Sequence, residues 1–223
     1  MFTKYGYSTL GIITIITFVF ISIGLFVSNN FLKSLLIILP VIFLIFSMYF
    51  FRDPERTAPK GENILVSPAD GKVLLIKDVY DNKYINGKAK QISIFMSPLN
   101  VHVNRIPISG KLEYLQYHKG EFVAAFNDKA SENNERCEFG INSKYGKVLF
   151  TQVAGAMARR IVYEIKPGDT VKIGERFGMI KFGSRVDVVV PEQWTAKVKK
   201  GEHVSAGETI LFENTTGQSG RQE

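Results

Sequence analysis

The sequence is short of the residues that most often build metal and cofactor sites. It contains one cysteine, Cys137, so no disulfide can form within the chain, which fits a reducing compartment. Its three histidines are scattered, and neither a cysteine–histidine cluster nor a nucleotide-binding glycine loop occurs. We therefore expect no metal site, and we expect Cys137 to be a small packed side chain.

Acidic residues are missing from the first 51 residues, which contain only two basic residues, Lys4 and Lys33. Ser8–Val27 is a run of 20 uncharged residues, and Phe31–Phe51 is a run of 21 interrupted by Lys33 alone. As a helix, each run would span about 30 Å, the thickness of a hydrocarbon core. Two long runs do not resemble a cleaved signal, which has one shorter stretch. Residues 1–51 are predicted to form a membrane-anchoring helical hairpin.

Alternatives to a spanning hairpin stay open, namely a pair of core helices or a hairpin that dips into one leaflet. The net charge of +7 lies mostly beyond residue 51, and beside an anchor it favours anionic lipid over nucleic acid. Lys4 precedes the first run, and Arg52, Arg56 and Lys60 follow the second. The positive-inside rule then predicts that both ends, and the domain 52–223, face the cytoplasm.

Residues 52–223 lack a convincing long amphipathic helix and are predicted to be β-rich. Short apolar stretches, many β-branched or alternating, are separated by Gly, Asp, Asn and Pro turns. A short helix is expected at Val123–Lys129. The expected strands are Ile64–Val66, Lys72–Ile76, Gln91–Met96, Lys111–Gln116, Lys147–Val153, Ile161–Ile165, Val186–Val190 and Thr209–Glu213.

A weak internal repeat indicates two similar turns. Lys166–Glu175 and Lys199–Glu208 share the pattern Lys-x-Gly-acid-x-Val-x-x-Gly-Glu at an offset of 33 residues. Glycines at matched places suggest related hairpins. The pattern is typical of a lipoyl- or biotinyl-like barrel-sandwich, so we expect a mainly β (α+β) fold with such a portion after the helical hairpin.

Three segments carry the candidate chemistry: Ser67–Gly71 (SPADG), Met96–Arg105 (MSPLNVHVNR) and Phe182–Asp187 (FGSRVD). Their order and context resemble phosphatidylserine decarboxylases, in particular the short membrane-anchored bacterial and archaeal branch. The resemblance runs from about Phe51 to Glu213 and includes an Asn-Glu-Arg stretch within 132–136. A Gly-Ser pair alone would carry no weight, because such pairs are common by chance.

The resemblance implies a proenzyme that cuts itself between Gly183 and Ser184. The Ser184 hydroxyl would attack the Gly183 carbonyl, and elimination would leave a β chain, 1–183, and an α chain, 184–223. The two chains would stay associated, with Ser184 converted to a covalent pyruvoyl group. That group would form a Schiff base with phosphatidylserine and accept the electrons left by CO₂, giving phosphatidylethanolamine.

Self-cleavage requires a base, since a neutral serine is a poor nucleophile. His102 is the candidate base and later acid, and Asp70 is the candidate carboxylate that holds its tautomer. Longer relatives carry a second histidine where this chain has Arg105, which leaves the base for cleavage open between His102 and Asp70. His118 is a reserve candidate, and His203 is expected to be exposed.

Arg105 and Arg185 are candidates for binding the lipid phosphate or the substrate carboxylate. The expected partner is phosphatidylserine in an anionic cell membrane, without nucleic acid, and a homo-oligomer stays open. Three alternatives also stay open. The substrate can be archaetidylserine or another serine-headed lipid, the chain can be a family member that has lost cleavage, or it can be a non-enzymatic membrane-anchored adaptor on a lipoyl-like fold.

Overall fold

The structure is a computed structural model of the chain that describes residues 1–61, 63–120, 134–155, 160–181 and 184–214, with the backbone alone for Ser184. It divides into two compact units, Met1–Glu55 and Arg56–Glu223. Each unit is described by itself. The short helix predicted at Val123–Lys129 lies outside the described residues.

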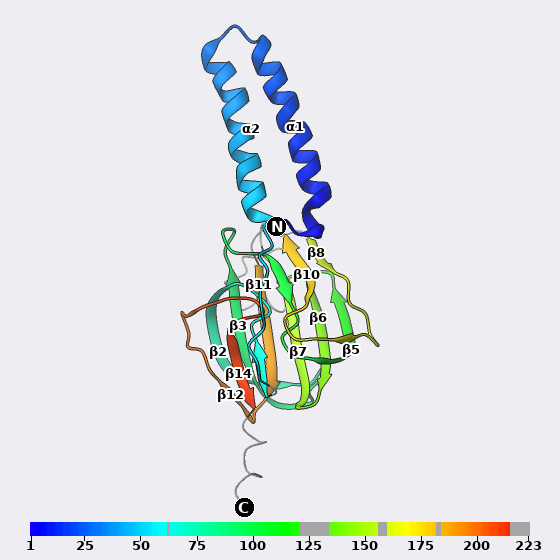
Figure 1. The fold of residues 1–223 in the computed structure, drawn as a ribbon. Coiled ribbons are helices and arrows are strands. Elements are labelled where there is room, and N and C mark those ends of the chain that lie inside the picture. The colour runs from blue at the N-terminus through cyan, green and yellow to red at the C-terminus, as the bar shows by residue number, and fades with distance from the viewer. Residues whose placement is uncertain (62, 121–133, 156–159, 182–183, 215–223) are drawn as a thin grey trace, which may run out of the picture. The chain divides into compact units, whose positions relative to one another are not determined.

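The first unit is a hairpin of two apolar helices (Figure 1). A short 3-10 turn, η1 (Lys4–Gly6), leads into α1 (Tyr7–Phe26), and α2 (Asn30–Phe50) follows. Asn29 caps α2, because its side chain accepts a hydrogen bond from the Leu32 amide at 3.1 Å. Both helices are long and apolar enough to cross a membrane. The predicted helices and the turn between them are confirmed.

The second unit is built from strands, which confirms the mainly β class. Within the described residues all eight expected strands are present, several of them longer than predicted, and six further strands, most of them short, were not expected. The strands are β1 (Ile64–Val66), β2 (Gly71–Asp81), β3 (Gly87–Met96), β4 (Val103–Arg105), β5 (Gly110–His118), β6 (Arg136–Ser143), β7 (Gly146–Ala154), β8 (Arg160–Tyr163), β9 (Thr170–Val171), β10 (Arg176–Lys181), β11 (Ser184–Pro191), β12 (Trp194–Ala196), β13 (His203–Val204) and β14 (Ile210–Asn214).

The described residues of this unit form three antiparallel sheets. The largest has the order β13-β2-β3-β11-β7-β6-β5-β9, and two three-stranded sheets have the orders β1-β14-β12 and β4-β10-β8. Strands β11 and β7 are the two central strands of the large sheet, with β3 and β2 on one side and β6 and β5 on the other (Figure 1). Strand β11 is therefore hydrogen-bonded along both edges.

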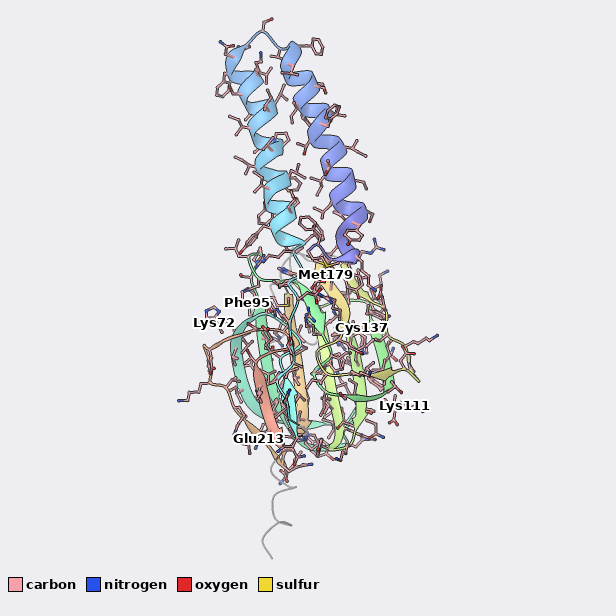
Figure 2. The ribbon with its side chains drawn as sticks, in the orientation of Figure 1. Lys72, Phe95, Lys111, Cys137, Met179 and Glu213 are labelled. Carbon is pink, nitrogen blue, oxygen red and sulfur yellow. The ribbon has the colours of Figure 1, made fainter. Side chains whose placement is uncertain are left out.

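The unit consists of two matched halves. In the large sheet β13-β2-β3-β11 correspond to β9-β5-β6-β7, and the β1-β14-β12 sheet corresponds to the β4-β10-β8 sheet. Half one contains β1, β2, β3 and β11 to β14, and half two contains β4 to β10. Lys72 pairs with Phe95 in half one as Lys111 pairs with Asn142 in half two, and a register shift follows in both. Figure 2 shows the matched Lys72 and Lys111 at opposite sides of the sheet. The halves differ in connection, since β6 runs into β7 by a short turn, whereas β3 and β11 are joined through all of half two.

The repeat seen in the sequence is confirmed as two equivalent turns, one in each half. Gly174 and Gly207 have φ angles of 81° and 77°, a left-handed conformation that glycine adopts without strain. In the turns just before them, the Asp169 and Glu202 side chains accept hydrogen bonds from the amides three residues earlier, both at 2.9 Å. The barrel-sandwich portion expected from this repeat stays a prediction.

Apolar side chains on the inner face of the large sheet form one core with the smaller sheets. Phe139 stacks on Phe150 with ring centroids 5.1 Å apart, and Phe177 meets both rings edge-on at 5.3 Å. Such aromatic pairs add about 0.5–1.5 kcal/mol each beyond their buried area. This packing joins β6, β7 and β10 at the middle of the central strand β7.

Candidate active site

The predicted cleavage residue begins a central strand. Ser184 is the first residue of β11, and its backbone pairs with Met96 at the end of β3 and with Ala154 at the end of β7. Gly183, the other residue of the predicted cut, lies outside the described residues. Ser184 therefore lies at the end of a central strand, where both neighbouring strands also end.

His102 follows β3 by a short loop and is fully buried. Its Nδ1 lies 2.9 Å from the Asn100 carbonyl oxygen. A carbonyl can only accept, so Nδ1 carries the proton in this contact, and Nε2 is the nitrogen that can take a proton in the neutral ring. The Asn100 side chain closes the loop by accepting hydrogen bonds from the Ser97 amide and hydroxyl, both at 2.9 Å.

The Asp70 carboxylate contacts Arg56 and the repeat turn at Ala206. It forms a two-pronged ion pair with Arg56, with Arg56 Nη2 2.8 Å from Oδ2, and accepts the Ala206 amide at 2.8 Å. Ser109 holds the matched place in half two, where its hydroxyl accepts the Ile173 amide at 2.9 Å. The Asn100 carbonyl thus orients His102 through Nδ1, and the catalytic role of Asp70 stays a prediction.

Arg105 is buried between the two repeat turns. Its guanidinium donates to the Gly174 carbonyl at 2.9 Å, and its side chain lies so close to Gly207 that a Cβ there would sit 2.7 Å from Arg105 Cδ. These contacts fasten the turns to β4. The substrate-binding role of Arg105 stays a prediction.

Arg185 is also fully buried, one residue beyond the predicted cut. Its Nε lies 2.9 Å from Asp187 Oδ1, and its Nη2 donates to Asp187 Oδ2 at 3.2 Å. Asp187 also lines a cavity of about 250 Å³ with Lys83 and Glu138. A buried cation beside a buried carboxylate is largely neutralised, and direct binding of substrate by Arg185 stays a prediction.

Buried amides surround the cross-strand partners of Ser184, and sequence reasoning gave none of them a role. Asn134 donates to the Ala154 carbonyl at 2.7 Å, and Gln152 Nε2 donates to Asn104 Oδ1 at 2.8 Å. All three amide side chains are fully buried. The signal in the sequence was faint, because Asn104 stands in the histidine segment and Gln152 interrupts an otherwise apolar strand.

Two cations face each other next to the predicted cut. Lys181, the last residue of β10, pairs across the ladder with Arg160 of β8. Burial and the Arg160 charge lower the pKa of Lys181. The end of β10 is therefore electropositive, which suits an anionic headgroup.

The other histidines and the cysteine are on strands β5, β13 and β6 and not in the loop that holds His102. His118 Nε2 is 3.3 Å from Glu138 Oε2 on the neighbouring strand. His203 is exposed on β13, as expected. Burial raises the pKa of Cys137 to about 12, so the thiol stays neutral, and the expected packed side chain is confirmed.

Comparisons with known proteins agree with the resemblance seen in the motifs. The family model described as phosphatidylserine decarboxylase matches residues 43–212. A phosphatidylserine decarboxylase proenzyme of Chlorobium phaeovibrioides is 49% identical over 216 residues, covering 95% of each chain. One of Pelodictyon phaeoclathratiforme is 47% identical, covering 95% of this chain and 99% of its own, and one of Salinibacter ruber is 51% identical over 80% of each.

Proposed function

The chain belongs to the phosphatidylserine decarboxylase family, and from this premise we propose that Ser184 is the residue at which the proenzyme is cut and from which its catalytic group is made. The chain is a carboxy-lyase that converts phosphatidylserine to phosphatidylethanolamine and CO₂. The observation that carries the proposal is the place of Ser184, at the first position of β11 with its backbone paired on both sides.

The surroundings of residue 184 suit a pyruvoyl group. The residues paired with residue 184 on both neighbouring strands, Met96 and Ala154, are fully buried, so the group would be shielded from bulk water. Once formed, the group supplies a ketone that condenses with the substrate amine and takes up the electron pair released with CO₂. No metal ion is part of this proposal.

His102 is the proposed base and acid. The Asn100 carbonyl holds the proton on Nδ1, which leaves Nε2 to take a proton from the Ser184 hydroxyl during cleavage and to return one to substrate later. Burial of the ring excludes water from this proton transfer. Asp70 is proposed to support both stages through the turn at Ala206, which it fastens together with Arg56.

The cut chains are proposed to stay together because strands of the C-terminal chain pair with strands of the N-terminal chain. Residues 184–223 contain β11, β12, β13 and β14. Strand β11 lies between β3 and β7, β13 pairs with β2, and β14 pairs with β1. Hydrogen bonding and core burial along these strands do not depend on the peptide bond before Ser184.

The apolar helices indicate association with a membrane, where the lipid substrate resides. We propose that residues 1–51 anchor the chain in an anionic cell membrane with the domain 52–223 in the cytoplasm. Lys181 and Arg160 add positive charge near the cut and suit the phosphate or carboxylate of the substrate. The barrel-sandwich portion suggested by the repeat belongs to this proposal.

Mass spectrometry of the full-length protein tests the proposal. We expect two chains, with residues 184–223 blocked at the first residue by a pyruvoyl group. Borohydride reduction should add two mass units to that chain alone, because it converts the ketone to an alcohol. An uncut chain with an intact serine that still releases CO₂ from phosphatidylserine would overturn the proposal.

A further inference from the structure

Two buried amides form a chain of hydrogen bonds that ends in an unpaired acceptor. Asn104 Nδ2 donates to the Pro68 carbonyl at 3.2 Å, and Gln152 Nε2 donates to Asn104 Oδ1 at 2.8 Å. Both side chains are fully buried, and Gln152 Oε1 has no hydrogen-bond partner in the part of the chain that the structure describes. A buried acceptor left unpaired is destabilising, so its presence requires a reason.

The orientation of both amides follows from the Pro68 carbonyl. Because a backbone carbonyl only accepts, the Asn104 atom that faces it must be the NH₂ group. The Met96 sulfur, a weak acceptor 3.8 Å from the same nitrogen, agrees with this assignment. Asn104 then presents oxygen to Gln152, which must contribute its own NH₂ group. The unpaired atom of Gln152 is therefore oxygen, and the group missing from it is a hydrogen-bond donor.

The fold does not need polar side chains at these two positions. In half one, Leu65 matches Asn104, because each is paired just before a register shift, with Phe212 and Gly178 respectively. Val190 matches Gln152, because the pair Lys90–Val190 corresponds to Cys137–Gln152. Leu65 and Val190 are fully buried apolar residues. Because apolar side chains fill the matched positions of half one, the packing of half two does not by itself require amides at residues 104 and 152.

Gln152 is also within reach of residue 184. It pairs with Val186 on β11, and Ala154, two residues along β7, pairs with Ser184. Diagonal neighbours of this kind share one face of a sheet at about 7–8 Å between Cα atoms, a distance that a long side chain can bridge. An acceptor is thus held beside the residue that the proposed function converts to the catalytic group.

We propose that Gln152 accepts a hydrogen bond from the amine of the serine headgroup and so directs that amine toward residue 184, with Asn104 as the positioning residue. This inference rests on the proposed function. The ammonium group carries three donors, whereas the phosphate and ionised carboxylate of the same headgroup carry none. A fixed acceptor therefore distinguishes the amine end of the substrate from its anionic ends, and a charged donor makes the stronger bond.

The test is a double variant of the full-length protein, Asn104→Leu with Gln152→Val, which gives half two the residues of half one. Amine capture is measured by trapping phosphatidylserine in detergent micelles with cyanoborohydride and weighing the C-terminal chain. We expect normal self-cleavage and a half-saturating lipid concentration raised roughly 10- to 100-fold, the effect of losing one hydrogen bond to a charged group. Gln91→Met, which removes an amide that bonds Ser93 elsewhere on the sheet, should trap like the native protein.

Each other outcome decides against the inference. Native half-saturation in the double variant would show that the amine does not use Gln152. A folded double variant that stays uncut would assign the amides to self-cleavage instead. If the native chain itself is uncut, the proposed function fails, and this inference fails with it.

A second variant covers the case in which the double variant does not fold. Gln152→Met keeps the length of the side chain and removes the acceptor oxygen, so it should raise the half-saturating lipid concentration while its C-terminal chain still carries the pyruvoyl mass. A native half-saturating concentration in this variant would overturn the inference.

Discussion

The two halves of the β-rich unit match in backbone pairing but differ in connection and in polar residues. In half two, Ser143 and Gly146 pair at the end of a hairpin that joins β6 to β7. The matching pair in half one is Met96 and Ser184, where the chain leaves and later returns. The predicted cut thus falls at the place of a hairpin turn. The comparison teaches that the repeated scaffold stabilises the unit, whereas the candidate chemistry lies where the halves diverge.

The largest effect on cutting and on decarboxylation is expected for Ser184→Ala. Without the hydroxyl no ester can form and no pyruvoyl group can arise, so we expect one uncut chain and complete loss of decarboxylation. Chain masses and CO₂ release from phosphatidylserine measure both. Removal of a hydroxyl from the matched hairpin of half two, Ser143→Ala, should leave cutting intact. A cut Ser184→Ala protein would remove the distinction between the halves.

A smaller effect is expected at the matched residues Asp70 and Ser109, each of which accepts an amide of a repeat turn. Asp70→Asn also breaks the ion pair with the nearly buried Arg56, at about 3 kcal/mol, whereas Ser109→Ala should cost about 1 kcal/mol. Thermal unfolding in a Ser184→Ala background compares them as single chains.

Cutting rates in the native background then separate two roles for Asp70. We expect a folded Asp70→Asn protein to cut more slowly than a folded Ser109→Ala protein. Equal cutting rates would confine Asp70 to fastening its turn.

Gly71 and Gly110 begin the matched strands β2 and β5, and they should respond alike. An added Cβ would lie 2.2 Å from the Phe95 carbonyl oxygen at Gly71 and 2.4 Å from the Asn142 carbonyl oxygen at Gly110. Overpacking of this kind destabilises by about 1–3 kcal/mol. Unfolding of Gly71→Ala and Gly110→Ala in the uncut background should give equal losses. A clear inequality would weaken the structural match between the halves.

The smallest effect depends on pH and concerns Glu138, whose match in half one is the neutral Gln91. Burial alone would raise the Glu138 pKa, but the Lys83 ammonium outweighs it, with help from Tyr114 and His118, and lowers that pKa. A lowered folded-state pKa gives stability above the unfolded value, near 4.5, that is lost as pH falls through the folded value.

Glu138→Gln should therefore lower stability by about 1 kcal/mol at pH 7, and the difference from the parent should shrink on acidification below pH 4.5. Urea unfolding at several pH values measures it. A difference independent of pH would show that the carboxylate charge contributes nothing.

Much of this architecture can be read from the sequence, because its signals are local. Apolar runs long enough to span a membrane predict the two helices, and short apolar stretches bounded by turn residues predict strands such as β1 and β7. Most of the strands that were missed are short, such as β9 and β13, which are held by pairing with distant partners rather than by their own pattern. The longest of them, β6, mixes charged, polar and apolar residues and was missed although it pairs with the neighbouring β7. The match between the halves was visible only as one repeated turn.

The candidate site is less predictable than the fold. Family motifs predict Ser184, His102 and Asp70, yet the group that orients the imidazole is a backbone carbonyl, at Asn100, which no side-chain pattern can indicate. The partners of Asp70 are 14 and 136 residues away, so that contact depends on tertiary structure. Gln152 stands out as a candidate only when it is compared with Val190, the apolar residue at the matched position of half one, and that match requires the structure.

Residues 184–223 contribute strands to the large sheet and to the β1-β14-β12 sheet, and this has a consequence for how the molecule unfolds and refolds. Before the cut, unfolding is unimolecular, and the tethered strands can find their places again. Afterwards the two pieces diffuse apart once denatured, so recovery becomes bimolecular and depends on protein concentration. The proposed cut therefore makes refolding depend on protein concentration, and persistence of the mature enzyme rests on how slowly it unfolds.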